Sequence, residues 1–167
     1  EMVYMLRALG FAARGFDPDS HYIQWARESL GLEVQRSRVD EMPVAPQSLD
    51  AATMYHVLEH MRDPVATLRR IRSWLKPGGL LVIEVPNLES IVQAPLHQFH
   101  RAHIHHFNQW TLTAAAGLGG FRVQHMAAQD EGENLFALLR EGGQAHDPVK
   151  PENAQRLVAL LGRHRTL

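Results

Sequence analysis

Residues 48–87 read SLDAATMYHVLEHMRDPVATLRRIRSWLKPGGLLVIEVPN, and this stretch decides the fold. The apolar runs at residues 51–55 and 80–85 are each typical of a buried strand. Between them, Asp63-Pro64 marks the start of a helix whose apolar residues recur at helical spacing. Residues 76–79, Lys-Pro-Gly-Gly, are predicted to end this helix, with both glycines at positive φ. Strand, helix and strand in this order form the unit of a parallel α/β sheet.

The sequence on either side continues the alternation and then closes with a pair of strands. Residues 148–151 read as a linker, and residues 152–161 as an amphipathic helix. We therefore expect one α/β domain over residues 1–147 and a C-terminal linker and helix over residues 148–167. The further expected elements are a helix over residues 3–9, strands over 11–16, 33–37, 121–127 and 134–140, and helices ending at Leu30 and spanning 109–118.

Composition narrows the class of protein. The chain has 167 residues, a net charge of −1 and no cysteine, so it offers no disulfide or thiolate site. The near-neutral charge gives no sign of a nucleic-acid or anionic-membrane surface. Neither a signal peptide nor a run of the roughly 18–20 apolar residues of a membrane span is visible. The sequence predicts a cytoplasmic protein with no membrane partner and no nucleic-acid partner.

The order of these motifs resembles the class I S-adenosylmethionine-dependent methyltransferases. The resemblance rests on the Glu-His, Asp-Pro, Leu-Lys-Pro-Gly-Gly and Val-Pro-Asn groups within residues 48–87, and it extends from about residue 11 to about residue 142. It implies a Rossmann-like three-layer sandwich in which a mostly parallel sheet has an antiparallel last strand, in the spatial order 3-2-1-4-5-7-6. It also implies S-adenosylmethionine as cofactor and a small-molecule methyl acceptor.

One part of the family pattern is missing from this sequence. The family's first strand and its Gly-rich loop would precede residues 3–9, where the sequence has neither. We therefore expect the chain to begin inside a longer domain, with a gap, or an N-terminal element from elsewhere, between the strands at residues 11–16 and 51–55. The alternative is a genuine truncation with a different sheet order and no cofactor site.

The resemblance implies a ribose-binding role for Asp17. This residue follows a short strand in the sequence Gly-Phe-Asp-Pro-Asp-Ser, so its carboxylate is expected at the carboxyl end of the sheet, where open α/β sheets bind ligands. The competing interpretation is that Asp17 caps the following helix, a role that Asp19 or Ser20 fills equally well. Since Asp17 precedes a proline, it is expected to lie outside that helix.

Five further residues are expected at the cofactor. By the same resemblance, Asp40 meets the adenine amino group, and the next residues, Glu41 and Met42, touch the ring, with Met42 packing on its face; the alternative is an ordinary turn. Tyr55 and His56 end a predicted strand and would lie beside the sulfonium and the acceptor.

A histidine-rich segment is the candidate acceptor site. By resemblance, His103 and Phe107 occupy the family's acceptor-loop positions. A histidine near neutral pKa suits removal of a proton from a hydroxyl acceptor, so His103 and His106 are the predicted catalytic residues. The alternatives are a polar loop and a metal cluster of imidazoles from residues 100–106.

A second metal alternative concerns His56, Glu59 and His60. The segment resembles the quinone-biosynthesis O-methyltransferases, whose Glu-x-x-Glu-His pattern binds magnesium, but here histidine replaces the first glutamate. Magnesium prefers oxygen ligands, so we expect no metal at these three residues.

The leading hypothesis is an S-adenosylmethionine-dependent methyltransferase that acts on a small molecule. The main alternative is a degenerate, non-catalytic methyltransferase-like domain used for binding or assembly. A nicotinamide-dependent Rossmann enzyme and a histidine-based metalloprotein are the other candidates.

Overall fold

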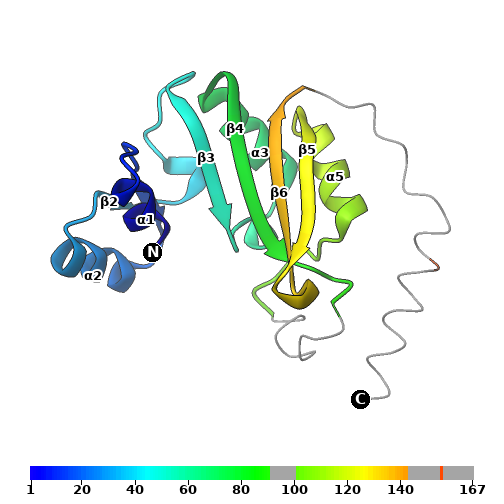
Figure 1. The fold of residues 1–167 in the computed structure, drawn as a ribbon, viewed down its shortest axis with the longest axis horizontal. Coiled ribbons are helices and arrows are strands. Elements are labelled where there is room, and N and C mark those ends of the chain that lie inside the picture. The colour runs from blue at the N-terminus through cyan, green and yellow to red at the C-terminus, as the bar shows by residue number, and fades with distance from the viewer. Residues whose placement is uncertain (91–100, 143–154, 156–167) are drawn as a thin grey trace. The chain divides into compact units, whose positions relative to one another are not determined.

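The computed structural model describes residues 1–90, 101–142 and 155. The chain divides into two compact units, one spanning Glu1–Val44 and one beginning at Ala45 (Figure 1). The predicted linker at residues 148–151 and nearly all of the predicted C-terminal helix lie outside the described residues.

The first unit holds a short parallel pair of strands. Its strands β1 (Gly15–Asp17) and β2 (Val34–Arg36) pair in parallel. Both are shorter than the strands predicted from the sequence. A small core of Ile23, Leu32 and Val34 packs beneath them. The helices of this unit are α1 (Met2–Ala8), α2 (Ser20–Leu30) and the 3-10 turn η1 (Val39–Glu41).

Helix α2 has defined ends. The Asp19 carboxylate accepts hydrogen bonds from the backbone N–H groups of His21 and Tyr22, at 2.7 and 3.4 Å. This is the N-cap arrangement that satisfies the otherwise unpaired first donors of a helix. The helix ends at Gly31, which adopts the left-handed conformation with φ 59°.

The second unit is a four-stranded sheet with the order β3-β4-β6-β5. Strand β3 is parallel to β4, and β6 is antiparallel to both β4 and β5. In Figure 1 these strands lie side by side, with α3 and α5 on one face of the sheet. The elements are β3 (Leu49–Tyr55), η2 (Leu58–His60), α3 (Pro64–Trp74), β4 (Leu75–Pro86), α5 (Gln109–Leu118), β5 (Phe121–Gln129), η3 (Asp130–Gly132) and β6 (Asn134–Glu141).

The predicted strand order is confirmed within each sheet. Strands β3, β4, β6 and β5 correspond to strands four, five, seven and six of the family order, and they are neighbours in this order. The predicted adjacent parallel pair is β3 and β4. Hydrogen bonding divides the strands into two sheets, because β1 pairs with β2 and β3 pairs with β4 among the described residues.

The core of the second unit lies between the sheet and its two helices. Alternate residues of β4 and β6 are fully buried and face one another across the antiparallel ladder: Leu81 with Leu139, Ile83 with Ala137, and Val85 with Leu135. Buried side chains of α3 and α5 cover them. This alternation is the period-two pattern of a sheet with a covered face.

Two expectations about the strands of this unit are wrong. Only Met54 of β3 is buried, and Ala51 is exposed, because β3 is the edge of its sheet rather than an interior strand. The helix ends at Trp74, and β4 runs through the Lys-Pro-Gly-Gly segment. Of its glycines, Gly78 has positive φ but Gly79 does not; a Cβ at Gly79 would lie 3.0–3.1 Å from two backbone oxygens.

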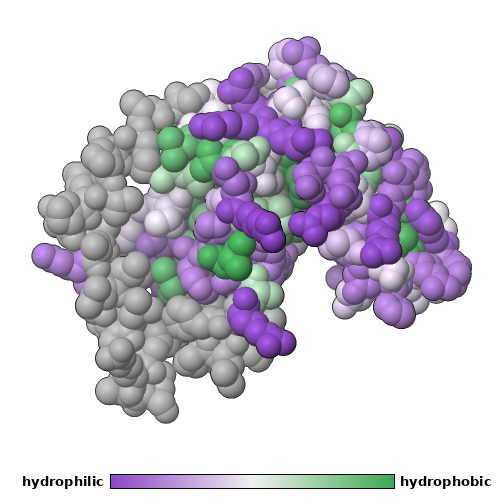
Figure 2. Space-filling view, turned by 180° about the vertical axis from the view of Figure 1, so that it is seen from behind, coloured by the Kyte–Doolittle hydropathy of each residue, from purple (hydrophilic) through white to green (hydrophobic). Residues whose placement is uncertain are grey.

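None of the helices in the described part of the chain is both long enough and apolar enough to span a bilayer. On the face shown in Figure 2, hydrophilic residues predominate, and hydrophobic residues form small separate patches.

Two leucines provide a test of this core. Replacing Leu81, which is fully buried in β4, by alanine should lower the free energy of unfolding by about 2–5 kcal/mol, because the change removes buried methyl groups and leaves a cavity. Urea unfolding followed by circular dichroism measures the loss. Leu118→Ala is the matched control: that side chain is 57% exposed, so its loss should stay within about 0.5 kcal/mol. Equal losses for the two variants would contradict this core.

Candidate functional site

The carboxyl ends of β3 and β4 bring a histidine between two carboxylates. His56 follows the last residue of β3 and adopts φ 51°, a left-handed conformation that is uncommon for residues other than glycine. Its backbone N–H donates to the Glu84 carbonyl at 3.0 Å, so the turn is fixed to β4. Its ring nitrogens Nδ1 and Nε2 lie 3.5 Å from Glu59 Oε1 and 3.4 Å from Glu84 Oε1.

This arrangement alters the pKa of two groups. The contact with Glu59 raises the pKa of His56 above its usual range, and the charge of Glu84 adds to this, while partial burial of the ring opposes it. Tyr55 lies opposite Glu84 in the β3–β4 register. Burial raises the pKa of the Tyr55 hydroxyl, and the nearby Glu84 charge raises it further.

Glu59 is the most buried charged residue of the site. It is 1% exposed, although it lies in the short turn η2. Its backbone carbonyl accepts hydrogen bonds from the N–H groups of Ile104 and His105, both at 3.0 Å. Next to it, His60 Nδ1 lies 2.7 Å from the Ala102 carbonyl. The turn after β3 therefore holds the described part of the histidine-rich segment by three contacts.

The structure separates the two histidines that the sequence proposed as catalytic. The ring of His103 lies against that of His60, with centroids 5.0 Å apart. His106 is largely exposed and is not part of that contact. Partial burial, followed by the charges of His103 and His105, lowers the pKa of His106, so its ring is neutral at physiological pH.

The end of the histidine-rich segment is fixed to the residues that follow β4 and to helix α5. Phe107 is buried and forms a bridge with Asn87, and its carbonyl accepts a hydrogen bond from the Leu88 N–H at 2.7 Å. Asn108 then caps α5 through a reciprocal pair of hydrogen bonds with Thr111, each 2.9 Å long. These contacts make the family-matching Phe107 an anchor of the backbone.

The predicted cofactor residues of the first unit lie after its two strands. Asp17 ends β1, and its Oδ1 accepts a hydrogen bond from the Asp19 N–H at 2.7 Å. The helix cap is Asp19, so the capping interpretation of Asp17 is wrong. Asp40 and Glu41 lie in the exposed turn η1, and Asp40 has an ion pair with Arg38 at 3.6 Å. Met42 follows this turn and is half-buried.

The sequence analysis missed Glu84. It lies in β4, and its side chain is 15% exposed. Its carboxylate contacts His56, and its charge raises the pKa of Tyr55. A signal was present, because Glu84 is a single charge within the apolar run at residues 80–85. A charged residue in such a strand is rarely buried without a partner, so it indicates a nearby cation or functional group.

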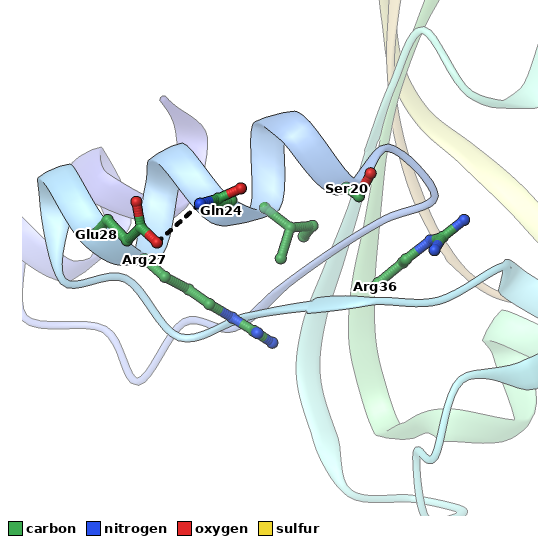
Figure 3. A pocket seen from close by; sticks show the side chains of 6 residues that line it. Ser20, Gln24, Arg27, Glu28 and Arg36 are labelled. Atoms are coloured by element: carbon green, nitrogen blue, oxygen red, sulfur yellow. Dashed lines mark hydrogen bonds between the residues drawn. The ribbon is translucent and has the colours of Figure 1, made fainter.

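A groove of about 310 Å³ lies on the first unit, between α2 and β2. Figure 3 shows its charged residues along one helix and one strand. Both arginine side chains are held by backbone carbonyls: Arg27 Nε donates to Val34 and Arg36 Nε donates to Pro18. Gln24 and Glu28 pair with each other at 3.0 Å. These contacts give both arginines a structural role in holding the backbone of the first unit.

The raised pKa of Tyr55 can be tested by titration. Glu84→Gln should lower this pKa toward the ordinary value of about 10, because the variant removes the neighbouring negative charge. The pKa should stay above that value, since burial is the larger cause and remains. The ultraviolet absorbance of the phenolate, taken as the difference between each protein and its Tyr55→Phe version, measures it. Glu141→Gln, which changes an exposed residue at the end of β6, is the control. An unchanged Tyr55 titration in Glu84→Gln would contradict the assigned cause.

Comparison with known proteins assigns the chain to a family. A family model described as a methyltransferase domain matches residues 1–126. A probable S-adenosylmethionine-dependent methyltransferase of Mycolicibacterium smegmatis is 26% identical over 132 residues, which are 77% of this chain and 49% of that protein. A tRNA U34 carboxymethyltransferase of Desulfotalea psychrophila is 32% identical over 57 residues, or 34% of this chain and 18% of that protein.

The fold is shared with solved structures. A crystal structure of an S-adenosylmethionine-dependent methyltransferase from Mesorhizobium loti matches with a TM-score of 0.65 and 17% identity, over 77% of this chain and 80% of that one. The chain spans about half or less of the length of the first curated relatives it matches. Because the family model matches residues 1–126, the chain belongs to the methyltransferase-domain family, and its fold is that of the class I S-adenosylmethionine-dependent methyltransferases.

Proposed function

We propose that the protein containing this chain is an S-adenosylmethionine-dependent methyltransferase that methylates a small molecule. The observation that supports this most directly is the position of the functional side chains. Asp17 ends β1, Tyr55 ends β3, and His56 follows directly, so each lies at the carboxyl end of a parallel strand. Ligands of open α/β sheets bind at these ends.

The cofactor roles follow from this placement. S-Adenosylmethionine supplies a methyl group that is already activated on a sulfonium. We assign Asp17 to the ribose hydroxyls; in its support, Asp19 caps α2 and the Asp17 carboxylate is not needed for that purpose. The turn with Asp40, Glu41 and Met42 would hold the adenine ring. Tyr55 and His56 would lie beside the methionine part and the acceptor.

His106 is our choice for the proton acceptor. The ring of His103 packs against His60, whereas His106 is largely exposed and has a lowered pKa. A neutral imidazole can accept a proton from a hydroxyl, which a protonated one cannot. Because methyl transfer is an in-line displacement, most of the remaining task is alignment, and the anchored Phe107 supports this by fixing the segment next to His106.

A small-molecule acceptor agrees best with the chain's charge. Nucleic-acid binding is dominated by phosphate contacts with lysine and arginine, and this chain has 17 basic and 18 acidic residues. Transfer from labelled S-adenosylmethionine to phenols and sugars, with tRNA as the comparison acceptor, distinguishes the two classes. Methylation of tRNA alone would exclude the small-molecule proposal. Cofactor binding without transfer to either class would favour the non-catalytic alternative.

The ribose role of Asp17 has a matched pair of variants. In the full-length natural protein, Asp17→Asn should weaken S-adenosylmethionine binding about ten- to a hundred-fold, because an amide replaces a charged acceptor of two hydroxyls. Calorimetric titration measures the affinity. Asp19→Ala should instead lower the stability of α2 by about 1 kcal/mol and leave the affinity nearly unchanged. Unchanged affinity in Asp17→Asn would remove the ribose assignment.

The base role predicts a change in turnover rather than in cofactor binding. His106→Ala should lower kcat by about a hundred-fold or more on a hydroxyl acceptor, while S-adenosylmethionine affinity stays near normal. His103→Ala is the comparison, because the sequence placed His103 at the family position. A loss of kcat in His103→Ala with normal kcat in His106→Ala would reverse the assignment.

A further inference from the structure

Three potential metal ligands converge beside the turn after β3. Glu59 and His60 come from that turn, and His103 comes from the histidine-rich segment. One ligand atom from each, a carboxylate oxygen and two ring nitrogens, lies within 4.8 Å of the other two. This group differs from the three residues that the sequence suggested, His56, Glu59 and His60, because it contains His103 in place of His56.

The carboxylate of this group lacks ordinary partners. Glu59 is 1% exposed, and neither of its carboxylate oxygens accepts a hydrogen bond from a described residue. Its nearest cationic candidates, His56 Nδ1 and His60 Nε2, lie at 3.5 and 3.8 Å. Burial of a carboxylate without hydrogen bonds costs several kcal/mol unless a cation compensates it.

The hydrogen bond of His60 determines which of its nitrogens faces the carboxylate. Because a carbonyl only accepts, His60 Nδ1 must donate to Ala102 O, and the neutral ring then has its lone pair on Nε2. That lone pair lies 3.8 Å from Glu59 Oε1, too far for a hydrogen bond. Facing lone pairs of a neutral ring and a carboxylate repel each other, and a cation bound between them would remove this repulsion.

We propose that Glu59, His60 and His103 bind a divalent transition-metal ion of the Zn²⁺ type. Ligands about 2.0–2.2 Å from one ion in tetrahedral geometry lie about 3.3–3.5 Å from each other, so small side-chain movements convert the observed cluster into a site. Two imidazoles and one carboxylate favour such an ion over Mg²⁺, which prefers oxygen ligands. The Ala102 carbonyl on His60 is the outer partner that fixes a ligating ring.

The ion would join two parts of the chain that are distant in sequence. It connects the turn after β3 to the segment at residues 101–107, in addition to the hydrogen bonds from Ile104 and His105 to the Glu59 carbonyl. Three protein ligands leave a fourth position open. The inference does not depend on the proposed methyltransferase activity, because metal binding is measured directly.

The experiment is a titration of the chelator-treated purified chain with Zn²⁺. Calorimetry should show one strong site, and Glu59→Gln, His60→Ala and His103→Ala should each weaken it at least about ten-fold, the loss that even an outer partner of a ligand causes. Co²⁺ should bind at the same site and give the visible absorption of a four-coordinate ion. An excess of Mg²⁺ should not displace Zn²⁺.

Two controls distinguish this site from other causes. His105→Ala removes an imidazole from the same segment, outside the cluster, and should leave Zn²⁺ affinity unchanged. His56→Ala should retain Zn²⁺ binding. Complete absence of Zn²⁺ binding in the parent chain would overturn the proposal and would mean that His56 alone balances the charge of Glu59. Circular dichroism confirms folding, and Zn²⁺ should raise the melting temperature of the parent but not of His103→Ala. Equal weakening by His105→Ala and His103→Ala would overturn the proposal.

Discussion

The parallel pairing of β3 with β4 is the constraint on which the candidate site depends. Since parallel strands end at the same edge of a sheet, the register that pairs Tyr55 with Glu84 also brings the following turn to β4. The hydrogen bond from the His56 N–H to the Glu84 carbonyl extends this pairing by one residue beyond the strand. The positive φ of His56 then turns the chain so that Glu59 becomes buried.

Burial of Glu59 connects the sheet to the histidine-rich segment. Its carbonyl holds two N–H groups of that segment, while its carboxylate lies among histidine rings. A charge in this position is costly to bury, and hydrophobic packing would stabilise the turn at lower cost. A carboxylate at this buried position therefore indicates a specific electrostatic task, either the ionisation of neighbouring imidazoles or the binding of a cation.

The sequence predicted the fold well because its signals are local. Strand runs and the Asp63-Pro64 start follow from apolar period and turn residues, whereas the antiparallel last strand was implied by the family resemblance. The exposure of β3 and the extension of β4 through Gly79 depend on which strand pairs with which, information that a local pattern does not contain. The same limit applies to the site: Asp17, Tyr55 and His56 were placed by their positions after strands, but the role of Glu84 requires the β3–β4 register.

The histidines show why the chemical roles of residues are harder to predict from one sequence than secondary structure is. His103 and His106 have the same side chain and lie three residues apart, so periodicity cannot separate their tasks, and family position, which favours His103, says nothing of their surroundings. Their surroundings do: one ring packs on His60 beside a buried carboxylate, and the other is largely exposed with a lowered pKa. A ring that ligates a metal cannot also accept a proton from substrate at the same nitrogen. The two proposals therefore assign different histidines, and the packing of the His103 ring against His60 is the contact that distinguishes them.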